Sequence, residues 1–229
     1  MRNLDLNKEK VRIIDFIRNY LSNAERDRLV VGLSGGVDSA VSTALAVEAI
    51  GSSNVTALIM PYETSNSESV ADASDLAKQL GIDYQIIDIT PVTKAYFENY
   101  APEADHLRIG NWLARIRMCV LYDFSAKLQA LVLGTSNRTE FMIGYFTQFG
   151  DSACAFEPIG HLYKTEVWKL AKILHIPERI INKTPTADLW PGQSDEQEIG
   201  ISYPLELYQK VEKMIQSSAF KRRMPPILE

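Results

Sequence analysis

The residues best suited to chemistry lie in one stretch, residues 29–40, which reads LVVGLSGGVDSA. Its first five residues are apolar and partly β-branched, the composition of a buried strand. Gly35 and Gly36 then break the strand, and from Asp38 onward the apolar residues recur at helical spacing. A strand, a glycine turn and a helix in this order direct unpaired backbone N–H groups and the positive end of a helix dipole at one point. This arrangement suits a phosphate.

Polar side chains of the turn would complete such a phosphate site. Ser34 and Ser39 supply hydroxyl donors, and Asp38 at the start of the helix can hold a metal ion that bridges phosphates. Glu140 follows the end of another predicted strand, so we expect it at the same sheet edge as Asp38. This pair would suit Mg²⁺, which is held by one or two carboxylates together with substrate phosphates. Two solvated carboxylates at helix starts are the alternative.

Three other interpretations of the glycine turn must be weighed. A Walker A loop requires GxxxxGK[ST], and this turn has neither the spacing nor the lysine. Residues 32–36 match GxSxG, the nucleophile elbow of serine hydrolases, in which Ser34 would need a histidine such as His161 or His175. No oxyanion motif such as HGGG accompanies it. A glycine pair that only makes a tight turn is the simplest alternative.

Two more segments carry residues of chemical interest. Asn111 and Arg115 are four apart and share a helical face, whereas Arg117 points elsewhere. An arginine fork suits a carboxylate or a phosphate, although charges on a helix more often mark a solvated face. The segment GYFTQFGD, residues 144–151, is rich in aromatic side chains, among them Phe146, that either pack or stack on a flat ring. Asp151 is a turn residue or a base.

Length and composition indicate one ordinary globular domain, residues 1–229. The chain has 46% apolar and 23% charged residues. A net charge of −5 argues against nucleic acid as a partner. Cys119 and Cys154 are far apart and form no CxxC motif, which indicates neither a disulfide framework nor a cysteine zinc site.

The chain shows no sign of export or membrane insertion. The polar start, MRNLDLNKEK, lacks the apolar core of a signal peptide. No apolar run approaches the roughly 20 residues needed to cross a bilayer. We therefore expect a cytoplasmic protein that contacts no membrane.

Hydrophobic periodicity predicts alternating strands and helices. Strands are expected at 29–33, 55–60, 84–89 and 130–134, and helices at 8–21, from 38, at 68–80, 91–100, 111–128, 165–174, from 177 and at 203–217. Residues 141–156 are expected to be a partly helical loop, and residues 184–202 a loop of the length typical of a lid. The order predicts an α/β fold with a doubly wound, mainly parallel sheet flanked by helices. Ligands of such sheets lie beyond the carboxyl ends of the strands, where the glycine turn is expected.

The string SGGVDS resembles the pyrophosphatase loop of the PP-loop ATP pyrophosphatases, which implies ATP cleaved between its α and β phosphates. An ordered set of further segments is similar to the ammonia-dependent NAD synthetases. The segments are SGGVDSA (34–40), NWLARIRM (111–118), GTSNRTE (134–140), GYFTQFGD (144–151), PIGHLYKTEV (158–167), PTADL (185–189) and GQSDEQEIGISY (192–203). No amidase segment accompanies them, so the resemblance is to the form that uses free ammonia.

The resemblance implies a function and a set of site residues. The expected reaction amidates deamido-NAD with ammonia at the expense of ATP, through an adenylated substrate, in a homodimer with Mg²⁺. ATP is expected at Gly32, Leu33, Ser34, Gly35, Gly36, Val37, Asp38, Ser39, Met60, Thr135, Lys164 and Thr186. Deamido-NAD is expected at Asn111, Arg115, Phe146 and Asp151. Asp38 and Glu140 would hold the metal, and these two together with Asp151 and Lys164 would be catalytic.

Further expectations follow from this resemblance. Arg138 and Lys164 would neutralise the departing pyrophosphate, and the loop around residues 192–195 would close over ATP. The alternatives are a tRNA-thiolating or lysidine-forming PP-loop enzyme, a serine hydrolase that uses Ser34, and a nucleotide-binding module without catalysis. The two tRNA enzymes need a basic surface or paired cysteines, and neither is visible in the sequence.

Overall fold

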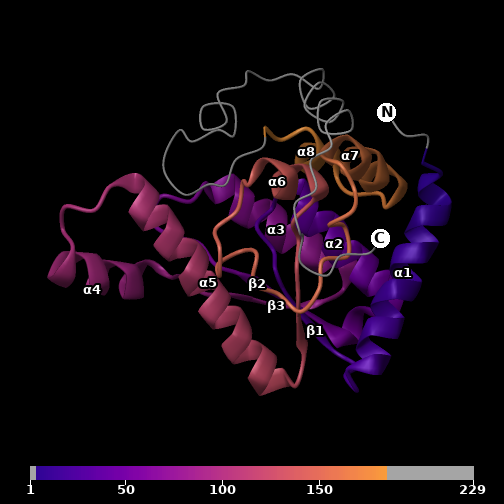
Figure 1. Ribbon diagram of the computed structural model, residues 1–229, viewed down its shortest axis with the longest axis horizontal. Coiled ribbons are helices and arrows are strands. Elements are labelled where there is room, and N and C mark those ends of the chain that lie inside the picture. The colour runs from indigo at the N-terminus through magenta and orange to yellow at the C-terminus, as the bar shows by residue number, and fades with distance from the viewer. Residues whose placement is uncertain (1–3, 185–229) are drawn as a thin grey trace.

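A parallel four-stranded sheet in the order β3-β2-β1-β4 lies at the centre of the structure. The strands are β1 (Leu29–Gly32), β2 (Val55–Ile59), β3 (Asp83–Ile86) and β4 (Leu131–Leu133). The structure is a computed structural model that describes residues 4–184 (Figure 1). Val31 of β1 pairs with Ala57 of β2 on one side and with Leu133 of β4 on the other. The doubly wound parallel fold that the sequence predicts is confirmed, with the glycine turn at the carboxyl end of a central strand.

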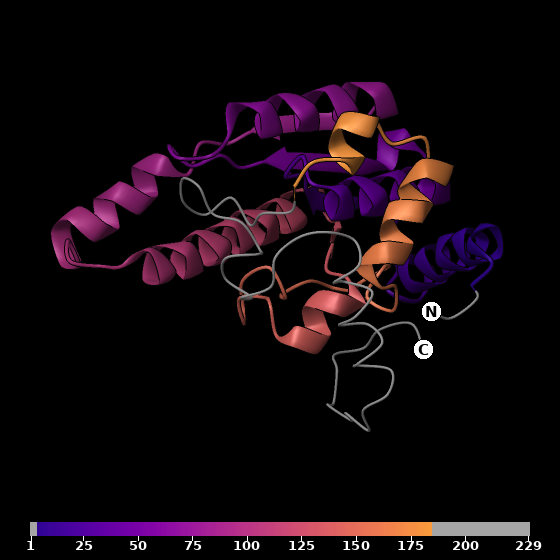
Figure 2. The ribbon, with the colours of Figure 1, turned by 90° about the horizontal axis from the view of Figure 1, so that it is seen from above.

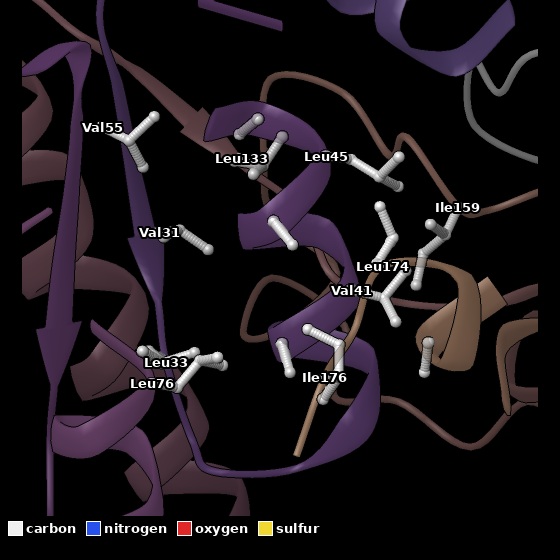
Figure 3. Packing of buried hydrophobic residues seen from close by; sticks show 14 of the residues in the cluster. Val31, Leu33, Val41, Leu45, Val55, Leu76, Leu133, Ile159, Leu174 and Ile176 are labelled. Carbon is white, nitrogen blue, oxygen red and sulfur yellow. The ribbon is translucent and has the colours of Figure 1, made fainter. Parts of the chain in front are cut away.

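Alternation along the strands sends side chains to two separate cores. Val31 and Leu33 face the larger core, in which Leu33 lies beside Leu76 (Figure 3). Val41 and Leu45, on the helix that follows the turn, face Leu174 and Ile159 in the same core. Val30 belongs to a second, smaller core with Leu58 and Val132. Successive residues of a strand point to opposite faces, so both faces of this sheet are buried by helices.

Helices cover the two faces unequally. The larger core is built with α1 (Leu6–Asn23), α2 (Val37–Ile50), α3 (Ser67–Leu80), α7 (Lys164–Ile173) and α8 (Glu178–Ile181). The smaller core rests on α5 (His106–Leu128), which runs diagonally across the other face (Figure 1). The helix α4 (Thr90–Tyr100) projects with the start of α5 from one side in both views, where Tyr96 stacks on Trp112 at 4.0 Å between ring centroids (Figure 2).

Within the described residues, the largest differences from the predicted element boundaries are at α5 and β3, and the other ends agree within two residues. The helix α5 begins at His106, five residues before the predicted start, because the Asp105 carboxylate caps it through the Arg108 N–H at 2.8 Å. β3 ends at Ile86 rather than residue 89, although the Ile89 N–H still donates to the carbonyl of Pro61. The short helix α6 (Arg138–Ile143) includes the first three residues of the predicted loop 141–156, and the rest of this segment is irregular. The expected lid loop, apart from Thr184, and the expected helix at 203–217 lie outside the described residues.

No helix within residues 4–184 is both long and apolar enough to span a bilayer.

Candidate active site

The glycine turn after β1 takes a backbone conformation that only glycine adopts easily. Gly35 has φ +80°, and a Cβ atom placed on it would lie 2.3 Å from the carbonyl oxygen of Ser69 in α3. The turn is therefore pressed against the start of α3, and a side chain at Gly35 is excluded on both conformational and steric grounds.

Serine hydroxyls form hydrogen bonds within the turn at the start of α2. The Gly36 N–H donates to Ser34 Oγ at 3.2 Å, and Ser39 Oγ donates to the Gly36 carbonyl at 3.0 Å. The two hydroxyl oxygens are 3.1 Å apart. No side chain caps the start of α2, which begins at Val37 after Gly36. The first N–H groups of this helix therefore face the adjoining cavity, as a phosphate site requires.

Lys164 joins the two carboxylates that the sequence pairs. Its ammonium forms an ion pair with Asp38 and lies 3.8 Å from Glu140 Oε1. Lys164 is 4% exposed, so this charge is buried. Asp38 also accepts a hydrogen bond from Asn137 Nδ2 at 2.9 Å. Three segments that are distant in the sequence thus place their charges at one point.

A capping box fixes the position of Glu140. The Glu140 N–H donates to Asn137 Oδ1 at 3.1 Å, and the Asn137 N–H donates to Glu140 Oε2 at 3.0 Å. The same Asn137 bonds Asp38, so the start of α6 is tied to the start of α2. β1 and β4 are neighbours in the sheet, which brings the two helix starts together.

The donor set around Lys164 fits a magnesium ion accompanied by phosphate. Asp38 and Glu140 both direct a carboxylate oxygen at the same cation, the Lys164 ammonium. Within residues 4–184 no three His, Cys, Asp or Glu side chains converge on a metal position. Two carboxylates are what Mg²⁺ commonly takes from a protein when phosphate oxygens and water supply the rest.

A cavity of about 580 Å³ opens beside these groups. Most of the residues that the sequence assigns to ligands line it: Gly32, Leu33, Ser34, Gly36, Val37, Asp38, Ser39, Met60, Asn111, Thr135, Glu140, Phe146, Asp151 and Lys164. Gly35 and Arg115 are not among the lining residues. Thr186 lies outside the described residues.

The arginines near the cavity take different positions. Arg117, which the sequence places on another helical face than Asn111 and Arg115, also lines the cavity, where its Nε donates to the Met60 carbonyl at 3.0 Å. Arg138 does not line the cavity, and its guanidinium lies 5.2 Å from the centre of the Tyr163 ring. Arg115 is exposed and donates to the Gln148 carbonyl at 3.2 Å, which ties α5 to the aromatic segment.

Thr147 connects Asn111 with Asp151. Its Oγ1 donates to Asn111 Oδ1 at 3.0 Å, and its N–H donates to Asp151 Oδ1 at 2.8 Å. Burial raises the pKa of the Asp151 carboxyl, and the hydrogen bonds from the Thr147 and Asp151 backbone oppose that rise. Asp151 is thereby held at the cavity as a carboxylate of increased basicity.

Glu157 is a buried carboxyl group behind the cavity wall that the sequence analysis missed. It is 2% exposed, it accepts the Ser136 N–H at 2.9 Å, and Cys154 Sγ donates to it at 3.3 Å. Burial raises the pKa of Glu157 to about 8. A Cβ atom on Gly134 would lie 2.3 Å from this carboxyl group, so a larger residue there would displace the Glu157 side chain. The EP dipeptide that begins at Glu157 carries no recognisable sequence signal for this role.

The histidines do not support the serine hydrolase hypothesis. His161 is buried away from the cavity, with Nε2 2.7 Å from Glu9 Oε1 of α1. None of His106, His161 and His175 lines the cavity that contains Ser34. Within the described hydrogen bonds, Ser34 contacts Ser39 and its own turn. A nucleophilic Ser34 activated by histidine therefore has no geometric basis.

Comparisons with known proteins point to one family. The sequence model of the NAD synthase family matches residues 9–207. An NH(3)-dependent NAD(+) synthetase from Fusobacterium nucleatum is 49% identical over 205 residues, which cover 89% of this chain and 79% of that protein.

Two solved structures resemble the fold over nearly its whole length. NMN synthetase from Francisella tularensis has a TM-score of 0.87 and 33% identity, and the match covers 96% of this chain and 89% of that one. NH3-dependent NAD synthetase from Campylobacter jejuni has a TM-score of 0.76 and 36% identity, and the match covers 99% and 100% of the two chains.

We predict that Gly35→Ala loses phosphate binding. The added methyl group would meet the Ser69 carbonyl and must also adopt φ +80°, which costs about 1–3 kcal/mol and displaces the turn. ATP affinity measured by titration calorimetry should fall at least about tenfold. Gly51→Ala is the control, because Gly51 also has positive φ but its added Cβ would meet nothing within 4 Å. Unchanged ATP affinity in Gly35→Ala would contradict the placement of phosphate at this turn.

We also predict that Glu157 makes stability fall as the pH rises. The pKa of Glu157 is about 8 in the folded chain and close to 4.5 in the unfolded chain. Between these values the unfolded chain has lost the proton that the folded chain keeps, so raising the pH favours unfolding by up to about 1.4 kcal/mol per pH unit. Thermal melts from pH 5 to 8 should show a smaller loss of Tm in Glu157→Gln than in wild type. The exposed Glu98→Gln is the control, and parallel curves for Glu157→Gln and wild type would contradict the buried, protonated carboxyl group.

Proposed function

The chain belongs to the NAD synthase family, and on this premise we propose that its cavity amidates deamido-NAD with ammonia at the expense of ATP, in the last step of NAD biosynthesis. The products are NAD, AMP and pyrophosphate. The observation that carries the proposal is the meeting of the SGGVDS turn, Asp38, Glu140 and Lys164 at one end of a cavity that contains Asn111 and Asp151.

The reaction needs activation because a carboxylate is a poor electrophile. Its negative charge repels nucleophiles, and its leaving group would be oxide. Attack of the carboxylate oxygen on the α phosphorus of ATP breaks the bond from that phosphorus to the bridging oxygen and releases pyrophosphate. The resulting acyl adenylate has a good leaving group. Ammonia then attacks the acyl carbon, and the bond from this carbon to the oxygen of AMP breaks.

The turn and Lys164 form the phosphate end of the site. The N–H groups at the start of α2 and the buried Lys164 ammonium would stabilise the charge that develops on the pyrophosphate. Asp38 and Glu140 would hold Mg²⁺, which supplies charge neutralisation at the phosphates. Such fixed charges in a partly dry cavity are commonly the largest contribution to catalysis.

Asn111 and Asp151 would form the substrate end. Asn111 and Phe146 would contact the nicotinate part of deamido-NAD, and Arg115 would approach it from the exposed edge of α5. Asp151 would accept the proton that ammonium must lose before it can attack. A carboxylate whose pKa is raised by burial is better suited to this task than an ordinary one.

We further propose a homodimeric, cytoplasmic enzyme built as a single domain. The projecting α4–α5 pair exposes apolar side chains, including Tyr100 at 77% and Leu107 at 65%. Exposed apolar surface of this kind commonly marks a contact between proteins. A second copy of the chain at this position would also shield the open side of the substrate end.

We predict that product analysis identifies the reaction. Purified protein with ATP, Mg²⁺ and ammonium should form AMP and pyrophosphate only when deamido-NAD is added, and should form NAD in equal amount. Glutamine in place of ammonium should support little turnover. Release of ADP and phosphate would contradict the proposal.

The same assay separates the two substrates named by the structural relatives. One relative is an NMN synthetase, so the deamidated mononucleotide is the second candidate acceptor. Comparison of kcat/KM for the dinucleotide and the mononucleotide decides between them. The relative that is 49% identical is an NH(3)-dependent NAD(+) synthetase, and we therefore expect the dinucleotide to be preferred.

We predict that Asp38→Ala and Glu140→Ala each lower kcat by about a hundredfold or more, because each removes a carboxylate from the phosphate end. The fold should survive, since neither side chain belongs to the hydrophobic cores. Circular dichroism and thermal melts check folding, and the surface variant Asp15→Ala is the control. Full activity in either variant would instead favour a nucleotide-binding module in which these carboxylates have no catalytic role.

A further inference from the structure

Lys183 brings a second, partly buried ammonium to the glycine turn. It follows α8 by two residues, and its Nζ lies 3.4 Å from the Gly35 carbonyl oxygen and 3.3 Å from Ser69 Oγ. Its side chain is 21% exposed, and the residue lines the cavity. Neither the helix periodicity nor the glycine motif places Lys183 near the turn, because its position depends on how α8 packs.

An ion pair with Asp72 of α3 holds Lys183 in place. Asp72 is 8% exposed and also accepts Arg179 Nε at 2.7 Å. Arg179 in turn reaches Asp75 at 2.9 Å, so α8 is fastened along α3 by charge. Asp72 therefore keeps a cationic partner in Arg179 even when Lys183 turns towards another anion. Asp72 therefore positions Lys183, while Arg179 can neutralise the charge of Asp72.

The two lysines contact different residues around the turn. Lys164 contacts Asp38 and Glu140, and Lys183 contacts the Gly35 carbonyl and Ser69. Both line the same cavity. A triphosphate carries about four negative charges, more than one ammonium and the α2 N–H groups can neutralise, so a second ammonium at the turn has phosphate charge left to meet.

We propose that Lys183 binds the pyrophosphate part of ATP and stabilises it as it leaves, with Asp72 and Arg179 as its positioning residues. This inference rests on the proposed function and adds a contact to the same site. The lysine keeps its proton throughout: it neutralises charge as the bond from the α phosphorus to the bridging oxygen breaks. Lys183 recognises the β and γ phosphates, so it adds no affinity for a ligand that has only an α phosphate.

The test compares binding of inorganic pyrophosphate and AMP, each with Mg²⁺, by titration calorimetry. The variant is Lys183→Gln, which retains a hydrogen-bond donor for the Gly35 carbonyl and removes the charge. Pyrophosphate affinity should fall about tenfold to a hundredfold, the value of a hydrogen bond to a charged group. AMP affinity should change less than about twofold. Lys183→Arg, which restores the charge, should recover part of the loss.

A matched control lies in the same charge cluster. Lys78 is 63% exposed, approaches Asp75 at 3.6 Å and does not line the cavity, so Lys78→Gln should leave both affinities unchanged. Thermal melts accompany each variant. Equal losses of pyrophosphate and AMP affinity in Lys183→Gln would overturn the proposal in favour of a purely structural role. Unchanged affinity for both ligands would also overturn the proposal. If wild type forms NAD but Lys183→Gln binds pyrophosphate normally, this inference alone fails. If wild type releases no pyrophosphate with deamido-NAD, both the proposed function and this inference fail.

Discussion

The site depends on one buried ammonium that serves two carboxylates. Lys164 pairs with Asp38 and lies 3.8 Å from Glu140, and these residues come from α7, α2 and α6. The side chains of Asp38 and Glu140 are 17% and 24% exposed, whereas that of Lys164 is 5% exposed, so water reaches the carboxylates more than the ammonium. Asn137 supplies a further hydrogen-bond donor to Asp38. Under the proposed function, the same two carboxylates would hold the magnesium ion that accompanies the phosphates.

The unequal covering of the sheet explains where the cavity lies. Five helices pack on one face and make the larger core, which holds β1, α2 and the glycine turn in fixed positions. On the other face α5 crosses the smaller core diagonally (Figure 1), and residues of its first half line the cavity. Thr147 then bridges α5 to the irregular segment, through Asn111 on one side and Asp151 on the other. The glycine turn, held by the larger core, thus shares the cavity with a wall that consists of a helix and a loop.

The sequence predicts those parts of the site that depend on local pattern and on sheet topology. The strand, glycine turn and helix follow from residues 29–40 alone, and neighbouring parallel strands bring Asp38 and Glu140 to one edge. The sequence does not predict Lys183 or Glu157, because both depend on packing between distant segments, α8 on α3 and residue 157 behind Gly134. The sequence also does not place Arg117 in the cavity, because this depends on how close α5 lies to the end of β2.

Two carboxyl groups near the cavity wall have different surroundings. Burial raises the pKa of both Asp151 and Glu157, and the charge of Asp151 raises that of Glu157 further. Asp151 receives hydrogen bonds from the Thr147 N–H and from its own backbone, which oppose the rise in its pKa, and it faces the cavity. Glu157 lies behind the cavity wall with a pKa of about 8, so near neutral pH it mostly keeps its proton. Under the proposed function, Asp151 is therefore the carboxyl group placed to accept the proton of ammonium, and Glu157 supports the wall behind it.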